Sequence, residues 1–201
     1  MINRILGAGI AALIFLFWAV LPAGAGEPTE QVKQTTDKIL SILDNPALKD
    51  PAKEQERKDL IRKAVDERFD WHEMARRTLA RHWLQRTPQE KEEFISLFAQ
   101  LLDRTYWHRV EDYSGEKVLY VGEEIDADYA AVEVKVLTSK NTEIPVLYKM
   151  KKKGREWMAY DVVIEGVSMV NNYRSQFADI ITKSSYQGLV KKLKEKIEEK
   201  E

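Results

Sequence analysis

The fold is decided by one stretch of the chain, YAAVEVKVLT at residues 129–138. From Val132 to Val136, valines at every second position alternate with a glutamate and a lysine. Such alternation is typical of a β-strand that has one face against a core and the other face in water. This stretch therefore predicts an antiparallel sheet with one buried face.

Three further runs of β-forming residues lie around this stretch, and short polar segments typical of hairpin turns separate them. Helical periodicity precedes the first run and follows the last one. Strands and helices do not alternate, as they would around a parallel sheet. We therefore expect an α+β fold with four antiparallel strands and flanking helices. The expected strands are Lys117–Gly122, Tyr129–Thr138, Glu143–Lys151 and Glu156–Glu165.

Signals for helix starts flank these strands. Thr87-Pro88-Gln89-Glu90 is a capping box, with a cap hydroxyl, a proline in the first turn and a carboxylate three residues after the cap. Asp50-Pro51 predicts a second helix start, and Asp70 with Glu73 predicts a third. After the strands, Ser168 is expected to cap one helix, and a last helix follows before the charged tail.

The composition narrows the function classes. The 201 residues contain 32 Lys+Arg and 33 Asp+Glu, so the net charge is −1. This near balance argues against nucleic acid as a partner, because nucleic-acid-binding proteins gather basic residues on one surface. The basic run Lys151–Arg155 is interpreted as a solvated hairpin turn, or alternatively as a contact for lipid headgroups or an acidic partner. No cysteine is present, which excludes thiol catalysis, cysteine-based metal sites and disulfides.

The first 25 residues have the pattern of an export signal. Arg4 precedes an apolar run at residues 5–21, and Pro22 and the small residues Ala23-Gly24-Ala25 follow it. We expect residues 1–25 to be a signal peptide that is cleaved after Ala25, and residues 26–201 to form a single domain. A retained transmembrane anchor is the alternative, because the apolar run is near the lower length limit of a membrane span.

The residues that could carry chemistry do not form a catalytic or metal-binding pattern. His72, His82 and His108 lack the spacing of metal ligands. The stretch GVSMV at residues 166–170 resembles a nucleophile elbow, but it ends on valine where the elbow needs glycine. Tyr160-Asp161 could be an acid–base pair, although neighbours on a strand point to opposite faces. We expect no catalytic residue, no cofactor and no metal.

Three stretches together resemble one protein family. Residues 157–170 read WMAYDVVIEGVSMV, and residues 79–88 read LARHWLQRTP, where the family typically has L-G-x-x-W before a Thr-Pro helix start. The tail GLVKKL at residues 188–193 also fits. Over most of its mature length the chain resembles MlaC, the phospholipid-binding component of an ABC transport system. Ala80 stands where the family usually has glycine, and we expect this to loosen the local geometry only slightly.

The resemblance implies a soluble carrier in the periplasm of a Gram-negative bacterium. Such a carrier holds the acyl chains of a phospholipid in a hydrophobic cavity between a twisted four-stranded sheet and the surrounding helices. It exchanges lipid between an inner-membrane ABC transporter with an MCE-domain subunit and an outer-membrane lipoprotein–porin complex, and so maintains outer-membrane lipid asymmetry. Two alternatives stay open: a carrier of a hopanoid or isoprenoid, and an enzyme with a conical pocket for a small hydrophobic substrate.

The predicted lipid wall follows from strand parity. Side chains at every second position share a face, so we place Tyr160 on the inward face with Val162 and Ile164. The opposite choice would place Trp157, Asp161 and Val163 there. The helix that begins at the capping box and the start of the next helix would close the cavity. The predicted lipid-binding residues are Phe94, Phe98, Leu101, Val132, Val134, Val136, Val146, Tyr148, Tyr160, Val162, Ile164, Val167 and Met169.

Overall fold

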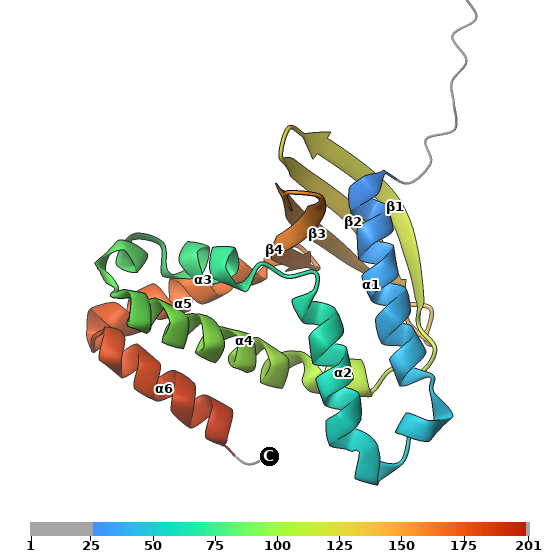
Figure 1. Ribbon diagram of the computed structural model, residues 1–201, viewed down its shortest axis with the longest axis horizontal. Helices are drawn as coiled ribbons and strands as arrows, with labels where there is room; N and C mark the ends of the chain where they lie inside the picture. The colour runs from blue at the N-terminus through green and yellow to red at the C-terminus, as the bar shows by residue number, and fades with distance from the viewer. Residues whose placement is uncertain (1–25, 200–201) are drawn as a thin grey trace, which may run out of the picture.

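The structure is a computed structural model that describes residues 26–199 (Figure 1). The predicted signal peptide, residues 1–25, and its cleavage site lie outside the described residues. Within the described part, no helix combines the length and the apolar character needed to cross a membrane. The helices are α1 Glu27–Leu43, α2 Glu54–Asp66, α3 Trp71–Leu79, α4 Pro88–Glu111, α5 Met169–Lys183 and α6 Tyr186–Glu198.

One antiparallel sheet has the strand order β1-β2-β3-β4-β5. Its first four strands correspond to the four predicted runs, and the α+β prediction is confirmed. The fifth strand was not predicted; it is a two-residue segment in which Ser168 pairs with Val163 of β4. β1 passes a bulge near Gly122 and continues beyond its predicted end. The strands are β1 Lys117–Asp126, β2 Tyr129–Leu137, β3 Glu143–Lys153, β4 Glu156–Ile164 and β5 Val167–Ser168.

The helices begin largely where the capping signals predict. The Thr87 backbone N–H donates to the Glu90 carboxylate at 2.9 Å, and the Glu90 N–H donates to Thr87 Oγ1 at 3.2 Å, which is the reciprocal pair of a capping box. Asp70 and Ser168 cap α3 and α5 with their side chains. Asp50 instead caps a short 3-10 turn, and α2 begins directly after that turn.

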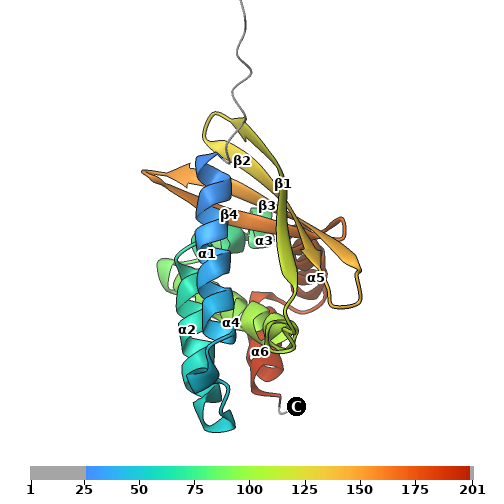
Figure 2. The same cartoon turned by 90° about the vertical axis from the view of Figure 1, so that its right-hand side faces the viewer.

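Helix α1 covers one part of the inner face of the sheet. In Figures 1 and 2 it crosses the strands, and its Val32 is 2% exposed. The sheet residues beneath it come from β2, β3 and β4, and they form one buried cluster with Val32. These residues are Ala130, Val132, Val134, Met150 and Trp157.

A second buried cluster lies among α3, α4, α5 and α6, which stack beside the sheet (Figure 1). Phe94 and Phe98 of α4 are fully buried there, and the Phe98 ring lies 5.5 Å from the Tyr173 ring of α5. This helical core reaches the sheet at Val162 of β4. The inner face of the sheet is therefore shared between α1 and the helical core.

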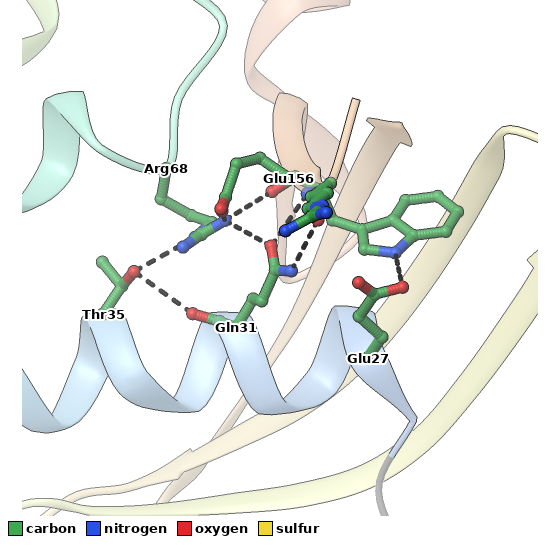
Figure 3. A network of polar contacts seen from close by, with 7 residues as sticks. Glu27, Gln31, Thr35, Arg68 and Glu156 are labelled. Atoms are coloured by element: carbon green, nitrogen blue, oxygen red, sulfur yellow. Dashed lines mark hydrogen bonds and ion pairs between the residues drawn. The ribbon is translucent and has the colours of Figure 1, made fainter. Parts of the chain in front are cut away.

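A buried arginine ties α1 to β4 (Figure 3). Arg68 is 7% exposed, and its Nη1 donates to Gln31 Oε1 of α1 at 2.7 Å and to the Trp157 carbonyl of β4 at 2.8 Å. Its Nε donates to Thr35 Oγ1 at 3.1 Å. One guanidinium thus satisfies groups from α1 and β4, which fixes the position of α1 on the sheet.

Candidate functional site: an apolar cavity between sheet and helices

An apolar cavity of about 260 Å³ lies between the inner face of the sheet and the helices; we call it the sheet–helix cavity. Its floor is Tyr148 of β3 with Val162 and Ile164 of β4. Tyr148 pairs directly with Val162, and Ile164 is two residues further along, so alternation puts all three on one face. The rest of the wall comes from α2 to α5 and from the turn before α3: Ile61, Arg62, Val65, Phe69, Trp71, Ala99, Leu102, Asp103, Tyr106, Trp107, Val110 and Met169.

The roof of the cavity is the C-terminal half of α4. Ala99, Leu102, Tyr106 and Val110 follow one another at intervals of three or four residues, so they share one side of the helix. The small side chain of Ala99 leaves space between α4 and the sheet. In the part of α4 that contains Phe94 and Phe98, a different side of the helix packs in the helical core. Helix α4 therefore packs in the helical core and also lines the cavity.

The helix residues predicted to close the cavity lie mostly elsewhere. Phe94, Phe98 and Leu101 are buried in the helical core and are absent from the cavity wall. Met169 does line the cavity. Val167 is 58% exposed and lines an adjoining pocket of about 210 Å³, which shares Met169, Tyr106 and Ile164 with the sheet–helix cavity.

Some of the strand residues predicted to bind lipid lie beneath α1, and others line the cavity. Val132 and Val134 lie beneath α1 and are at most 2% exposed, so they do not line the cavity. Val146, half-buried, packs against both buried clusters, and Val136 lies further along the same face, paired with Ile144. In addition to Met169 of the helices, the cavity wall contains the predicted residues Tyr148, Val162 and Ile164.

Tyr160 does not share the face of Val162, and the expected parity is wrong at this position. The register of β3 and β4 shifts there, because Lys149 pairs with Asp161 whereas Met150 pairs with Ala159. Tyr160 is the extra residue of this bulge, and its ring contacts Tyr129 at 6.0 Å and the Arg77 guanidinium at 4.0 Å. The bulge switches the parity along β4, so Trp157 also faces inward, beneath α1.

The tyrosine in the floor of the cavity is neutral. Burial raises the pKa of Tyr148 to about 12, because the phenolate is poorly solvated there. The hydroxyl is therefore protonated throughout the physiological pH range. Tyr148 therefore adds no charge to the floor.

Three charged residues and a tryptophan lie at one side of the cavity. We call these residues, Arg62, Asp66, Trp71 and Asp103, the mouth cluster. Arg62 Nη1 lies 3.4 Å from Asp103 Oδ2, and Arg62 Nε lies 3.2 Å from Asp66 Oδ1. The Trp71 indole N–H donates to Asp66 at 2.7 Å. The side chains of Arg62 and Asp103 are 27% and 26% exposed, whereas Leu102 on the same wall is 4% exposed. The cavity therefore opens to solvent beside this cluster.

The residues considered for catalysis have structural roles. Ser168 Oγ donates to Asp161 Oδ2 at 2.7 Å and accepts the Asn171 N–H at 3.0 Å, so this hydroxyl caps α5. The hydrogen bonds of residues 26–199 join no histidine to Ser168. In the same range, no three His, Asp or Glu side chains gather closely enough to hold a metal ion. The side chain of His108 lies outside the described residues.

The sequence analysis missed the contribution of α2 and of the turn that follows it. Ile61 and Val65 are four residues apart on α2, and Phe69 and Trp71 stack at a ring distance of 5.4 Å. In the sequence, Ile61 and Val65 form an apolar stripe with helical spacing. Nothing in that stripe indicated that it faces a cavity instead of a filled core.

Residues 33–195 match the protein family described as MlaC protein. The chain belongs to the MlaC family. The resemblance found in the sequence is thereby confirmed. MlaC proteins are non-enzymatic lipid carriers, in agreement with the expectation that this chain is not an enzyme.

Two curated relatives of this MlaC-family chain are similar over part of their length. The "intermembrane phospholipid transport system binding protein MlaC" of Haemophilus influenzae is 25% identical over 124 residues, which cover 59% of this chain and 58% of the relative. The "toluene tolerance protein ttg2D" of Pseudomonas putida is 25% identical over 99 residues, covering 49% and 46%. The chain thus spans about half the length of the curated relatives it matches.

A solved structure resembles the MlaC-family fold over nearly its whole length. It is the phospholipid-binding protein from Ralstonia solanacearum, determined in complex with a phospholipid. The TM-score is 0.77 and the identity is 27%, and the match covers 86% of this chain and 97% of the other. The arrangement of sheet and helices around the cavity therefore belongs to a fold that has been crystallised with this class of ligand.

Proposed function

We propose that this chain is a carrier that holds the acyl chains of a phospholipid in the sheet–helix cavity. The cavity itself is the main support, because its apolar wall lies in a fold that is shared with a protein solved in complex with a phospholipid. Each buried methylene contributes about 0.8 kcal/mol, so removing acyl chains from a membrane requires a continuous apolar wall. A few polar contacts to a headgroup would not offset that loss.

The cavity is small for a two-chain lipid, so we propose that the bound lipid widens it. About 260 Å³ is slightly below the range of roughly 300–1,000 Å³ that is usual for small-molecule sites. The adjoining pocket of about 210 Å³ shares Tyr106, Ile164 and Met169 with the cavity and supplies further apolar surface. Two chains would occupy both spaces and move α2 and α4 away from the sheet. The predicted wall residues beneath α1 would become accessible only if α1 also shifted.

The carrier is proposed to work in the periplasm between two membranes. Its partners would be an inner-membrane ABC transporter with an MCE-domain subunit and an outer-membrane lipoprotein–porin complex, and its task the maintenance of outer-membrane lipid asymmetry. The name of the Haemophilus influenzae relative, a transport system binding protein, supports this assignment. We further propose cleavage after Ala25 and a single domain at residues 26–201. Intact-mass measurement of the exported protein should then show Gly26 as the first residue.

Mass spectrometry of an organic extract tests the ligand directly. The protein is purified from the periplasm without detergent, extracted, and its lipids are counted per protein molecule. A two-chain phospholipid near one per protein supports the proposal. A polycyclic or isoprenoid lipid would establish a different cargo, and an extract without lipid would refute the carrier assignment.

A matched pair of variants on α4 localises the ligand to the cavity. Ala99→Phe places a ring in the cavity where the alanine now leaves space, and it should lower the lipid count at least severalfold. Gln100→Phe puts the same ring on the exposed side of the same helix, and its lipid count should match the wild type. Circular dichroism confirms that both variants fold. Equal lipid counts in folded Ala99→Phe and wild type would show that the chains lie elsewhere.

A further inference from the structure

The mouth cluster contains both signs of charge beside an otherwise apolar wall. Arg62 and Asp103 are the charged residues among those that line the cavity, and they pair with each other at 3.4 Å. Asp66 lies on the other side of the guanidinium at 3.2 Å. One cation between two carboxylates leaves this group with an excess negative charge.

We propose that the mouth cluster selects phospholipids whose headgroup carries an ammonium group as well as the phosphate. This inference rests on the proposed function, because acyl chains in the cavity bring the headgroup to the mouth. The phosphate takes the guanidinium of Arg62, which is suited to bidentate contact with phosphate oxygens. When Arg62 contacts the phosphate, its ion pairs with Asp66 and Asp103 weaken. The two carboxylates then contact the ammonium group.

Charge balance disfavours a headgroup that is anionic overall. Lys58 lies at the same end of the wall, with its Nζ 5.0 Å from the centre of the Trp107 ring. Lys58 together with Arg62 balances the charges of Asp66 and Asp103, so these four side chains sum to zero. A zwitterionic headgroup keeps this balance, whereas an anionic headgroup adds a phosphate charge that faces two carboxylates.

Trp71 adds a surface for an ammonium group. Its ring already attracts the Arg62 guanidinium, which lies 5.6 Å from the ring centre, and its indole N–H holds Asp66 in place. Tryptophan is the side chain that attracts cations most strongly through its ring face. The aromatic ring and the two carboxylates thus provide a set of contacts that a glycerol headgroup cannot use.

A competition between two lipids tests the inference. Delipidated full-length mature protein is incubated with vesicles of phosphatidylethanolamine and phosphatidylglycerol in equal amounts and with identical acyl chains. Bound lipid is separated from the vesicles and quantified by mass spectrometry. We expect about threefold or greater enrichment of phosphatidylethanolamine in the bound fraction, the size that a partly exposed ion pair supplies.

Two carboxylate-to-amide variants show whether the mouth cluster causes the enrichment. Asp103→Asn should bring the ratio of the two bound lipids close to their ratio in the vesicles. Asp179→Asn, which alters an exposed carboxylate of α5 paired with Lys183, should keep the wild-type ratio.

Equal uptake of both lipids by the wild type, or unchanged enrichment in Asp103→Asn, would overturn the selection and leave the carrier function standing. If Asp103→Asn does not fold, Asp66→Asn on the exposed end of α2 takes its place with the same expectations. No uptake of either lipid would refute the carrier function itself.

Discussion

Replacing Ala80 with glycine should stabilise the protein. Ala80 ends α3 with φ 48° and ψ −121°, the mirror image of the first central residue of a type II turn. An L-residue with a Cβ is strained in this conformation, whereas glycine adopts it readily. The sequence analysis expected Ala80 to loosen the turn only slightly, but the structure instead shows a backbone in a glycine conformation.

The expected gain is about 1 kcal/mol. A non-glycine residue in a sparsely populated region costs roughly 1–3 kcal/mol, and this strain would be released. Glycine makes the unfolded chain more flexible, which costs about 0.4–1 kcal/mol. Ala80 is exposed, so removal of its methyl group forfeits little packing. For a domain of this size, 1 kcal/mol raises Tm by about 2–4 °C.

Thermal unfolding with a matched control checks this value. Ala178→Gly makes the same change inside α5, where the backbone is helical, and it should lower the unfolding free energy by about 1 kcal/mol. The two variants should therefore move Tm in opposite directions. If Ala80→Gly lowers Tm by as much as Ala178→Gly does, the turn is not strained and the reasoning is wrong.

Three further predictions concern polar contacts. Arg76 and Arg77 hold the pKa of Glu73 at about 2 instead of 4.5, so the wild type should lose stability as pH falls from 4.5 to 2, and Glu73→Gln should lose less over that interval in pH-dependent unfolding. Arg68→Met leaves the Trp157 carbonyl without its donor and should cost about 3 kcal/mol in urea unfolding, with Arg68→Lys costing less. Ser168→Ala should lower the free energy of unfolding by about 1–2 kcal/mol and leave the lipid content unchanged, because Ser168 is a helix cap. Phospholipid turnover by the wild type that this variant abolishes would contradict the prediction.

The fold was predictable because local signals agreed along most of the chain. The alternation around Val134 fixed which residues face inward on β2, and the Thr87 capping box fixed the start of α4. Both signals depend on near neighbours in the sequence. β5 was not predictable, because two residues carry no periodicity and its pairing with β4 is set by the turn at Gly166.

The inward-facing positions of the strands follow the predicted alternation except at the bulge in β4. Period-two reasoning assumes an uninterrupted pleat, and a single extra residue reverses the parity of everything beyond it. Tyr160 is that residue, so Trp157 on one side and Val162 on the other both face inward. No feature of the local sequence marks the bulge. It follows from the way the segment before α3 and β5 pair with the outer edge of β4.

Whether an inward residue fills a core or lines a cavity depends on what lies opposite it. Val134 and Ile164 both point inward, but α1 lies directly on Val134, whereas Ile164 faces the gap between the sheet and the helices α2 and α4. Val134→Glu would therefore be expected to dislodge α1, and it would report on folding more than on lipid. Ala99 shows why the gap persists, since a larger residue on α4 would close it. The position of the cavity is thus set by the packing of distant helices, which explains why hydrophobicity along the chain could predict an apolar face but could not predict where that face remains unfilled.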